Sequence, residues 1–197
     1  AQSTLLQETR ALSGHELTRR ERAQARAMGE RQESLRRAME KLCQETKELA
    51  DAKVFGFAHA RLAGAMSRAG KALSEGDAGP SVARDEQASV AVLHSLVESL
   101  EDAQKQDEFR QAQGGGSGGG ASGGRKPQLL PTLAQLKLLR GMQGEAAART
   151  REVGDSPKGE GLEDVAGLQA ELSRLGKELV EELNAGEGEP ALPEPPK

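Results

Sequence analysis

Three histidines and one cysteine are the side chains best suited to bind a metal ion or to act as a nucleophile. His15, His59 and His94 include no pair at the four-residue spacing that places two ligands on one helix face, and no cysteine cluster accompanies them. His59 falls on an apolar stripe and His94 lies beside one, so we expect both to be partly buried in a helical bundle. Cys43 is expected to be a partly packed thiol on a helix surface.

Paired carboxylates and a glycine-rich run are the other patterns that could carry chemistry. Glu101-Asp102 and Glu181-Glu182 are expected on exposed helix faces, whereas a catalytic acid needs a pocket that shifts its pKa. The run Gly114–Gly124 leads into Arg125-Lys126-Pro127 and not into the Gly-Lys-Ser/Thr of a phosphate-binding loop. We therefore predict that the protein is not an enzyme and has no catalytic, cofactor-binding or metal-binding residues.

The composition narrows the classes of partner. The 197 residues include no Trp or Tyr and only three Phe, so the core must be built from Leu, Ala, Val and Met, which suits helix-on-helix packing. A net charge of -4 and the scarcity of aromatic side chains argue against a nucleic-acid partner. No apolar run reaches the length of a membrane span, so we expect no membrane insertion of this segment. The partners expected are proteins or other copies of the chain.

The elements that would position these side chains begin with the stretch Ser3–Lys53, which is predicted to form one long helix. Its apolar positions repeat every seven residues and form a narrow seam that needs a partner helix. Gly14 marks either a kink in this helix or a boundary between two helical pieces. The seam positions are Met28, Leu35, Leu42 and Leu49.

Two more helices are predicted before the glycine run. The first carries Phe55, His59, Leu62, Met66, Ala69 and Leu73 on one stripe. It ends at the turn 75–80, after which Ser81 is expected to cap a third helix that runs from 82 to 113. The stripe predicted for that third helix is Val90, Leu93, Val97 and Leu100. Residues 1–113 should therefore form a three-helix bundle or coiled coil.

The second half of the chain is predicted to be a flexible Gly/Ser linker at 114–128, a two-helix hairpin at 129–184 and a disordered Pro/Glu tail at 185–197. The hairpin helices should cover Leu133–Val153 and Leu162–Asn184, the second with leucines in a three–four rhythm. The fold class is thus all-α, with five long helices in antiparallel hairpins and essentially no strand.

The first hairpin helix is dense in leucine on more than one face, so it must be covered on more than one side. We expect Leu130, Leu133, Leu138 and Leu139 to form an interaction surface for a protein partner or a second copy. The alternative is that these leucines dock on the chain's own bundle. Replacing Leu138 by Glu separates the two, because only internal docking predicts a large loss of stability.

One segment resembles a known class of protein. A glycine-rich run followed by residues 126–140, KPQLLPTLAQLKLLR, is similar to the C-terminal helical region of large bacterial envelope proteins. That resemblance implies export to the periplasm and association with proton-channel or transport assemblies, and it implies no catalytic residues. The function expected is a non-catalytic structural or protein-interaction module of the envelope. The alternative is a cytosolic coiled-coil adaptor or regulatory segment.

Overall fold

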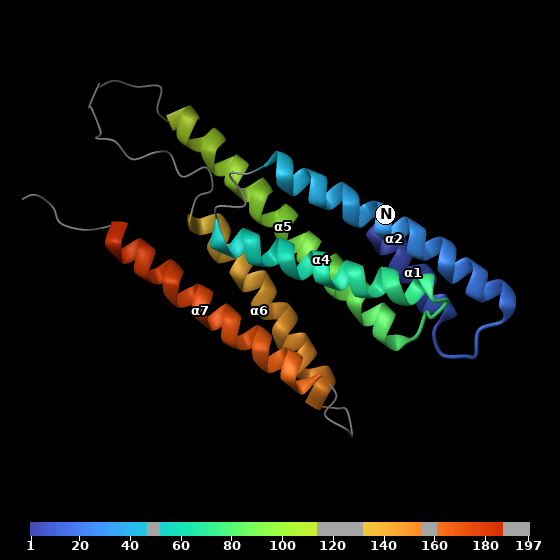
Figure 1. The fold of residues 1–197 in the computed structure, drawn as a ribbon. Helices are drawn as coiled ribbons and strands as arrows, with labels where there is room; N and C mark the ends of the chain where they lie inside the picture. The colour runs from blue at the N-terminus through green and yellow to red at the C-terminus, as the bar shows by residue number, and fades with distance from the viewer. Residues whose placement is uncertain (47–51, 114–131, 155–160, 187–197) are drawn as a thin grey trace, which may run out of the picture.

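The structure, a computed structural model, describes residues 1–46, 52–113, 132–154 and 161–186, with side chains described up to 101 in the second range and 184 in the last. Within these ranges the chain forms six helices and no strand, which confirms the all-α prediction (Figure 1). The predicted linker and most of the predicted tail lie outside the described residues. The helices are α1 (Gln2–Leu12), α2 (Arg19–Glu45), α4 (Lys53–Ser74), α5 (Pro80–Gln113), α6 (Thr132–Gly154) and α7 (Leu162–Gly186).

The prediction of one long helix over Ser3–Lys53 is wrong, and Gly14 is the boundary. Gly14 has a φ of 103°, a conformation that ends α1 and that side chains beyond glycine rarely adopt. Thr18 then starts α2 with a reciprocal cap, in which its hydroxyl accepts from the Glu21 amide at 3.3 Å and its own amide donates to the Glu21 carboxylate at 2.8 Å. The chain therefore reverses direction, and α1 packs against α2 and α5.

The heptad seam of α2 is only partly buried. Met28 is buried, and Leu35 packs against the core with part of its surface exposed. Leu42 is 53 % exposed, so its predicted burial is wrong, and Leu49 lies outside the described residues. Gln32, four residues after Met28, is fully buried, and its side-chain oxygen accepts a hydrogen bond from Gln2 of α1 at 3.0 Å.

Helix α4 follows its predicted stripe. Five of the six stripe residues are buried, and His59 is half-buried. The helix runs antiparallel to α2 and approaches it closely, because a Cβ on Gly29 would lie 2.8 Å from the Ser74 backbone nitrogen. Gly29 is therefore one of the positions that set the α2–α4 spacing.

Helix α5 buries a different face from the one predicted. Val97 is 52 % exposed and Leu100 36 % exposed, whereas Val92 and Leu96 are buried. Buried Ser89 and Ser99 satisfy their hydroxyls on backbone carbonyls of their own helix, so polar residues occupy core positions and displace the hydrophobic pattern. His94, predicted to be partly buried, is exposed. The helix begins at Pro80, so Ser81 is not the cap. In the turn before the helix, the Asp77 carboxylate accepts from the Gly79 amide at 2.8 Å.

Helices α6 and α7 form the predicted antiparallel hairpin and lie side by side (Figure 1). The second helix continues two residues beyond the predicted end, to Gly186, so the tail does not begin at 185. Buried side chains of α4, α5, α6 and α7 form one continuous core, so the hairpin packs directly on the first bundle. The central members of this core are Phe55, Leu62, Val92, Leu96, Leu138, Met142, Leu172, Leu175 and Leu179.

Candidate functional site

The leucines predicted as an interaction surface fall into different environments. Leu138 is completely buried and Leu139 is 5 % exposed, and both belong to the core shared with α4 and α5. This placement corresponds to the internal alternative for these two residues. Leu133, at the start of α6, is 42 % exposed, and Leu130 lies outside the described residues. An accessible apolar surface on this hairpin must therefore include side chains besides Leu138 and Leu139.

A groove between α6 and α7 supplies such a surface. Its floor is apolar, because Leu136 and Leu139 from α6 meet Leu172 from α7 there. Gly176 lies against this floor, since a Cβ at that position would make an ordinary van der Waals contact with the Leu139 side chain at 3.4 Å. Val180, which is 50 % exposed, forms part of the wall. The remaining lining residues are polar or charged: Arg140, Gln143, Ser173, Lys177 and Glu181.

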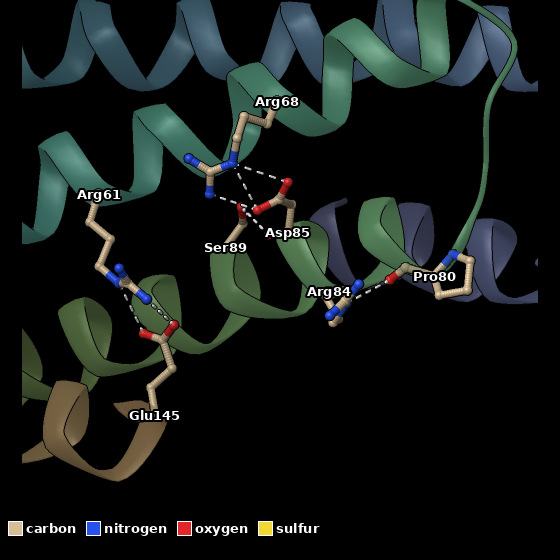
Figure 2. Close-up of polar contacts among 7 residues, drawn as sticks. All are labelled: Arg61, Arg68, Pro80, Arg84, Asp85, Ser89 and Glu145. Carbon is tan, nitrogen blue, oxygen red and sulfur yellow. Dashed lines mark hydrogen bonds and ion pairs between the residues drawn. The ribbon is translucent and has the colours of Figure 1, made fainter. Parts of the chain in front are cut away.

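Ion pairs from α4 hold the hairpin in place. Arg61 of α4 pairs with Glu145 of α6, with Nη2 to Oε1 at 2.8 Å, and both side chains are largely buried (Figure 2). Lys53 at the start of α4 reaches Glu178 and Glu182 of α7 at 3.0 and 3.1 Å. These carboxylates raise the pKa of Lys53, which stays protonated at neutral pH. The pairs set the register of α6 and α7 on the first bundle.

A third pair from α4 faces α5. Arg68 donates to both oxygens of Asp85, at 2.7 Å from Nη2 and 3.1–3.2 Å from Nε (Figure 2). Asp85 is largely buried, and its hydrogen bonds raise the pKa of Arg68. Next to it Arg84 donates to the Pro80 carbonyl at 3.4 Å within the first turns of α5. Arg68 thus joins α4 to α5, and Arg84 bonds within the first turns of α5.

The structure brings Cys43 and His59 together, a contact that the sequence analysis did not predict. Sγ of Cys43 on α2 lies 2.7 Å from Nδ1 of His59 on α4. Burial raises the pKa of the Cys43 thiol and lowers the pKa of the His59 imidazole, so both groups are neutral at pH 7. A cysteine nucleophile needs the opposite shift, toward a thiolate. The pair therefore forms a neutral thiol–imidazole contact that joins α2 to α4.

The other predicted candidates remain apart from one another. His15 bonds with Glu21 beside the start of α2, and His94 bonds with Glu98 on the exposed side of α5. Glu181 and Glu182 are exposed on α7, as predicted, and Glu101 is exposed on α5. Among the described residues no three side chains of the His, Cys, Asp and Glu types gather as a metal ion would require.

Sequence reasoning missed the α7 side of the groove and the ion pairs that mount it. Lys53 and Arg61 are cations in the first half of a largely apolar, alanine-rich helix, and this contrast was the available signal. Gly176 and Val180 were a weaker signal in the sequence. They interrupt the polar face of a helix whose buried stripe consists of leucines.

Two general findings complete the description of the site. None of the helices in the described ranges is long and apolar enough to cross a membrane. The chain has no match among family models, curated proteins or solved structures.

Proposed function

We propose that this chain is a non-catalytic helical structural and protein-interaction module of a bacterial cell-envelope protein. The observation that carries the proposal is the open groove between α6 and α7, with Leu136, Leu139 and Leu172 in its floor and exposed Val180 in its wall. An apolar floor with a polar rim is the surface that an amphipathic helix recognises. Exposed Leu133 extends this apolar surface toward the start of α6.

The mounting of the hairpin supports this role. A docking surface gains affinity when it is held rigid before the partner arrives. Here the shared core and the pairs Arg61–Glu145 and Lys53–Glu178 fix α6 and α7 on the first bundle. The groove would therefore be preformed. Its occupant is an amphipathic helix of a protein partner or of a second copy of the chain, anchored by apolar side chains and positioned by Arg140, Lys177 and Glu181.

The assignment to the envelope rests on the resemblance of residues 126–140, together with the preceding glycine run, to exported bacterial proteins. From the same resemblance we propose that the partner belongs to a proton-channel or transport assembly and that the module works on the periplasmic side. A cytosolic coiled-coil adaptor is the second candidate. Leu42 favours it, since this seam residue of α2 is 53 % exposed and is available to another helix.

The test combines location with a groove variant in the full-length protein. Val180→Glu places a charge in the groove wall, whereas Leu162→Glu places one at a 60 % exposed leucine at the start of α7 that does not line the groove. We expect the protein to fractionate with the cell envelope and Val180→Glu alone to abolish co-purification of the partner or self-association. Cytosolic fractionation with association lost in Leu42→Glu would support the adaptor instead. If Val180→Glu retains the association, the groove is not the interaction surface.

A further inference from the structure

Glu86 of α5 is an ionisable residue that the proposed interaction surface does not use. Its side chain is completely buried, and neither carboxyl oxygen forms a hydrogen bond of ordinary geometry with the described residues. A carboxylate in this position is unfavourable, because burial removes its hydration and nothing replaces it. The protonated acid is much less affected. The site is therefore built to hold Glu86 with a proton.

Helix α1 covers this site. Thr9, on the buried face of α1, is itself fully buried, and its hydroxyl lies close enough to the carboxyl of Glu86 to lower the pKa of that group. The Thr9 hydroxyl also lacks an ordinary hydrogen bond among the described residues. The contact between α1 and α5 therefore buries two facing polar groups that do not fully satisfy each other, and burying such groups is unfavourable.

The remaining attachments of α1 are apolar packing and a small number of polar contacts. Leu5 and Leu12 pack into a small apolar cluster with Met28 of α2 and Val82 of α5. At one end of α1, Gln2 donates to Gln32, and the second polar atom of each of these buried amides is unpaired. The exposed edges carry a hydrogen bond from Arg10 to Gln87 at 2.6 Å and an ion pair between Arg31 and Glu8.

The connection to the rest of the chain allows α1 to move as a unit. Residues 13–18 join α1 to α2 without helical structure, and Gly14 lies in this segment with a positive φ. The N-terminus of α1 has no side-chain cap, so its first turn is held by tertiary contacts such as the hydrogen bond from Gln2 to Gln32. An eleven-residue helix of this kind is unstable alone and depends on its packing.

We propose that Glu86 is a proton-binding site and that α1 is a latch which closes over protonated Glu86 and is released when Glu86 ionises. Release would uncover the apolar surface of α2 and α5 around Met28 and Val82. The ligand is a proton, and the reporter of its binding is the position of α1. This device is independent of the groove between α6 and α7.

The charged groups around Glu86 favour this behaviour. From α1 the facing charge is Glu8, whose repulsion disfavours ionisation of Glu86, and from α2 it is Arg31, whose attraction is weaker and is shared with Glu8. From α4 the neighbouring cation is Arg68, but it is engaged with Asp85. Helix α6 meets α5 farther along, near Ser95. Burial, as the largest effect, raises the pKa of Glu86 from 4.5 to about 7.

The sign of the pH dependence follows from these values. With α1 released, Glu86 meets water and titrates near its ordinary pKa of 4.5, whereas with α1 closed it titrates near 7. The closed form therefore binds more protons between these values, so closure is strongest below about pH 4.5 and weakens as the pH rises to about 7. The ratio of closed to open α1 falls close to tenfold for each pH unit between the two pKa values and levels off above the higher one. It should therefore fall roughly 70-fold between pH 5 and pH 8.

Hydrogen exchange of the α1 amides, measured on the full chain, tests the proposal. Glu86→Gln is the control, because it resembles the protonated acid in shape and cannot ionise. Comparing the two proteins at each pH removes the intrinsic pH dependence of exchange. Between pH 5 and pH 8, we expect the protection factors of the α1 amides in the wild type to fall several tens-fold relative to those in Glu86→Gln. The protection factors of the α6 and α7 amides should be the same in both proteins. Carboxyl carbon chemical shifts should place the titration of Glu86 near pH 7 in the wild type.

Three results would overturn the latch. The first is equal pH dependence of α1 protection in the wild type and in Glu86→Gln. The second is a loss of protection spread evenly over all helices, which would make Glu86 a determinant of global stability only. The third is titration of Glu86 near its ordinary value in the wild-type protein, a measurement that stands even if Glu86→Gln fails to fold.

Discussion

The ion pair between Arg61 and Glu145 offers the sharpest test of how the hairpin is mounted. The Arg61 side chain is 17 % exposed and that of Glu145 is 8 % exposed, so each charge depends on the other for solvation. Replacing Arg61 by Met keeps the packing of its stem and leaves a carboxylate almost buried without its partner. Loss of one partner from a fully buried pair costs about 3–5 kcal/mol, and residual access to water reduces this to about 2–3 kcal/mol here. Glu145→Gln should cost a similar or smaller amount.

The double variant separates the pair from its surroundings. Arg61→Met with Glu145→Met removes both charges and keeps apolar volume, so it should be within about 1 kcal/mol of the wild type. Urea denaturation monitored by circular dichroism would measure these free energies, and a loss of 2–3 kcal/mol corresponds to roughly 5–10 °C in Tm for a chain of this size. The reasoning is refuted if the single variants lose under about 0.5 kcal/mol or if their effects add in the double variant.

Three further predictions follow from buried or crowded positions. Leu138→Ala should reduce the free energy of unfolding by about 3 kcal/mol and Leu138→Glu should unfold the hairpin, whereas denaturation midpoints equal to the wild type would mean that Leu138 is not a core residue. Gly29→Ala should lose about 1–2 kcal/mol, because its Cβ would meet the Ser74 backbone nitrogen at 2.8 Å, and an unchanged thermal midpoint would show that α2 and α4 separate easily. Because burial raises the pKa of Cys43 above its ordinary 9.0, its alkylation at pH 7 should be slower than that of a free thiol, and its rate should still be rising with pH where the rate of a free thiol levels off. Faster reaction than a free thiol at neutral pH would contradict the neutral contact with His59.

Apolar periodicity predicted the buried face correctly in the helices whose core positions are all apolar. The stripe from Phe55 to Leu73 is buried against α2 and α5, and the leucines from Leu168 to Leu179 are buried against α6 and the bundle. In both helices the apolar residues follow the helical repeat, and charged side chains lie on the remaining surface. The helix boundaries were also close, because glycine and proline marked the turns at 75–80 and near 161.

The same reasoning failed where polar residues are buried. Helix α5 contacts α1, α4 and α6, so it has little free surface along its first half, and its core face includes Glu86, Ser89 and Ser99. Serine hydroxyls in a helix can donate to backbone carbonyls of the preceding turn, so that burying them costs little free energy. A search for hydrophobic residues therefore does not identify the buried face of this helix. In the opening stretch the heptad pattern outweighed Gly14 and the Thr18–Glu21 cap, so the reversal between α1 and α2 was not predicted.

The candidate site was predicted only in part for a related reason. Leucine density on α6 correctly indicated a helix covered on more than one side, but the sequence does not say which of those sides belongs to the chain itself. The structure uses Leu138 and Leu139 internally and leaves the groove to residues of both helices. Gly176 and Val180 become significant only when α7 is placed beside α6, because contacts between helices depend on register.

The most direct test of the proposed function is photo-crosslinking in intact cells. A photoreactive amino acid at Val180 of the full-length protein lies in the groove wall, and the same amino acid at Leu162 lies on the same helix outside the groove. The proposal predicts that Val180 yields a specific adduct with a second polypeptide, or with another copy of the chain, and that Leu162 does not. No adduct at Val180, or the same adducts from both positions, would contradict the assignment of the groove as an interaction surface.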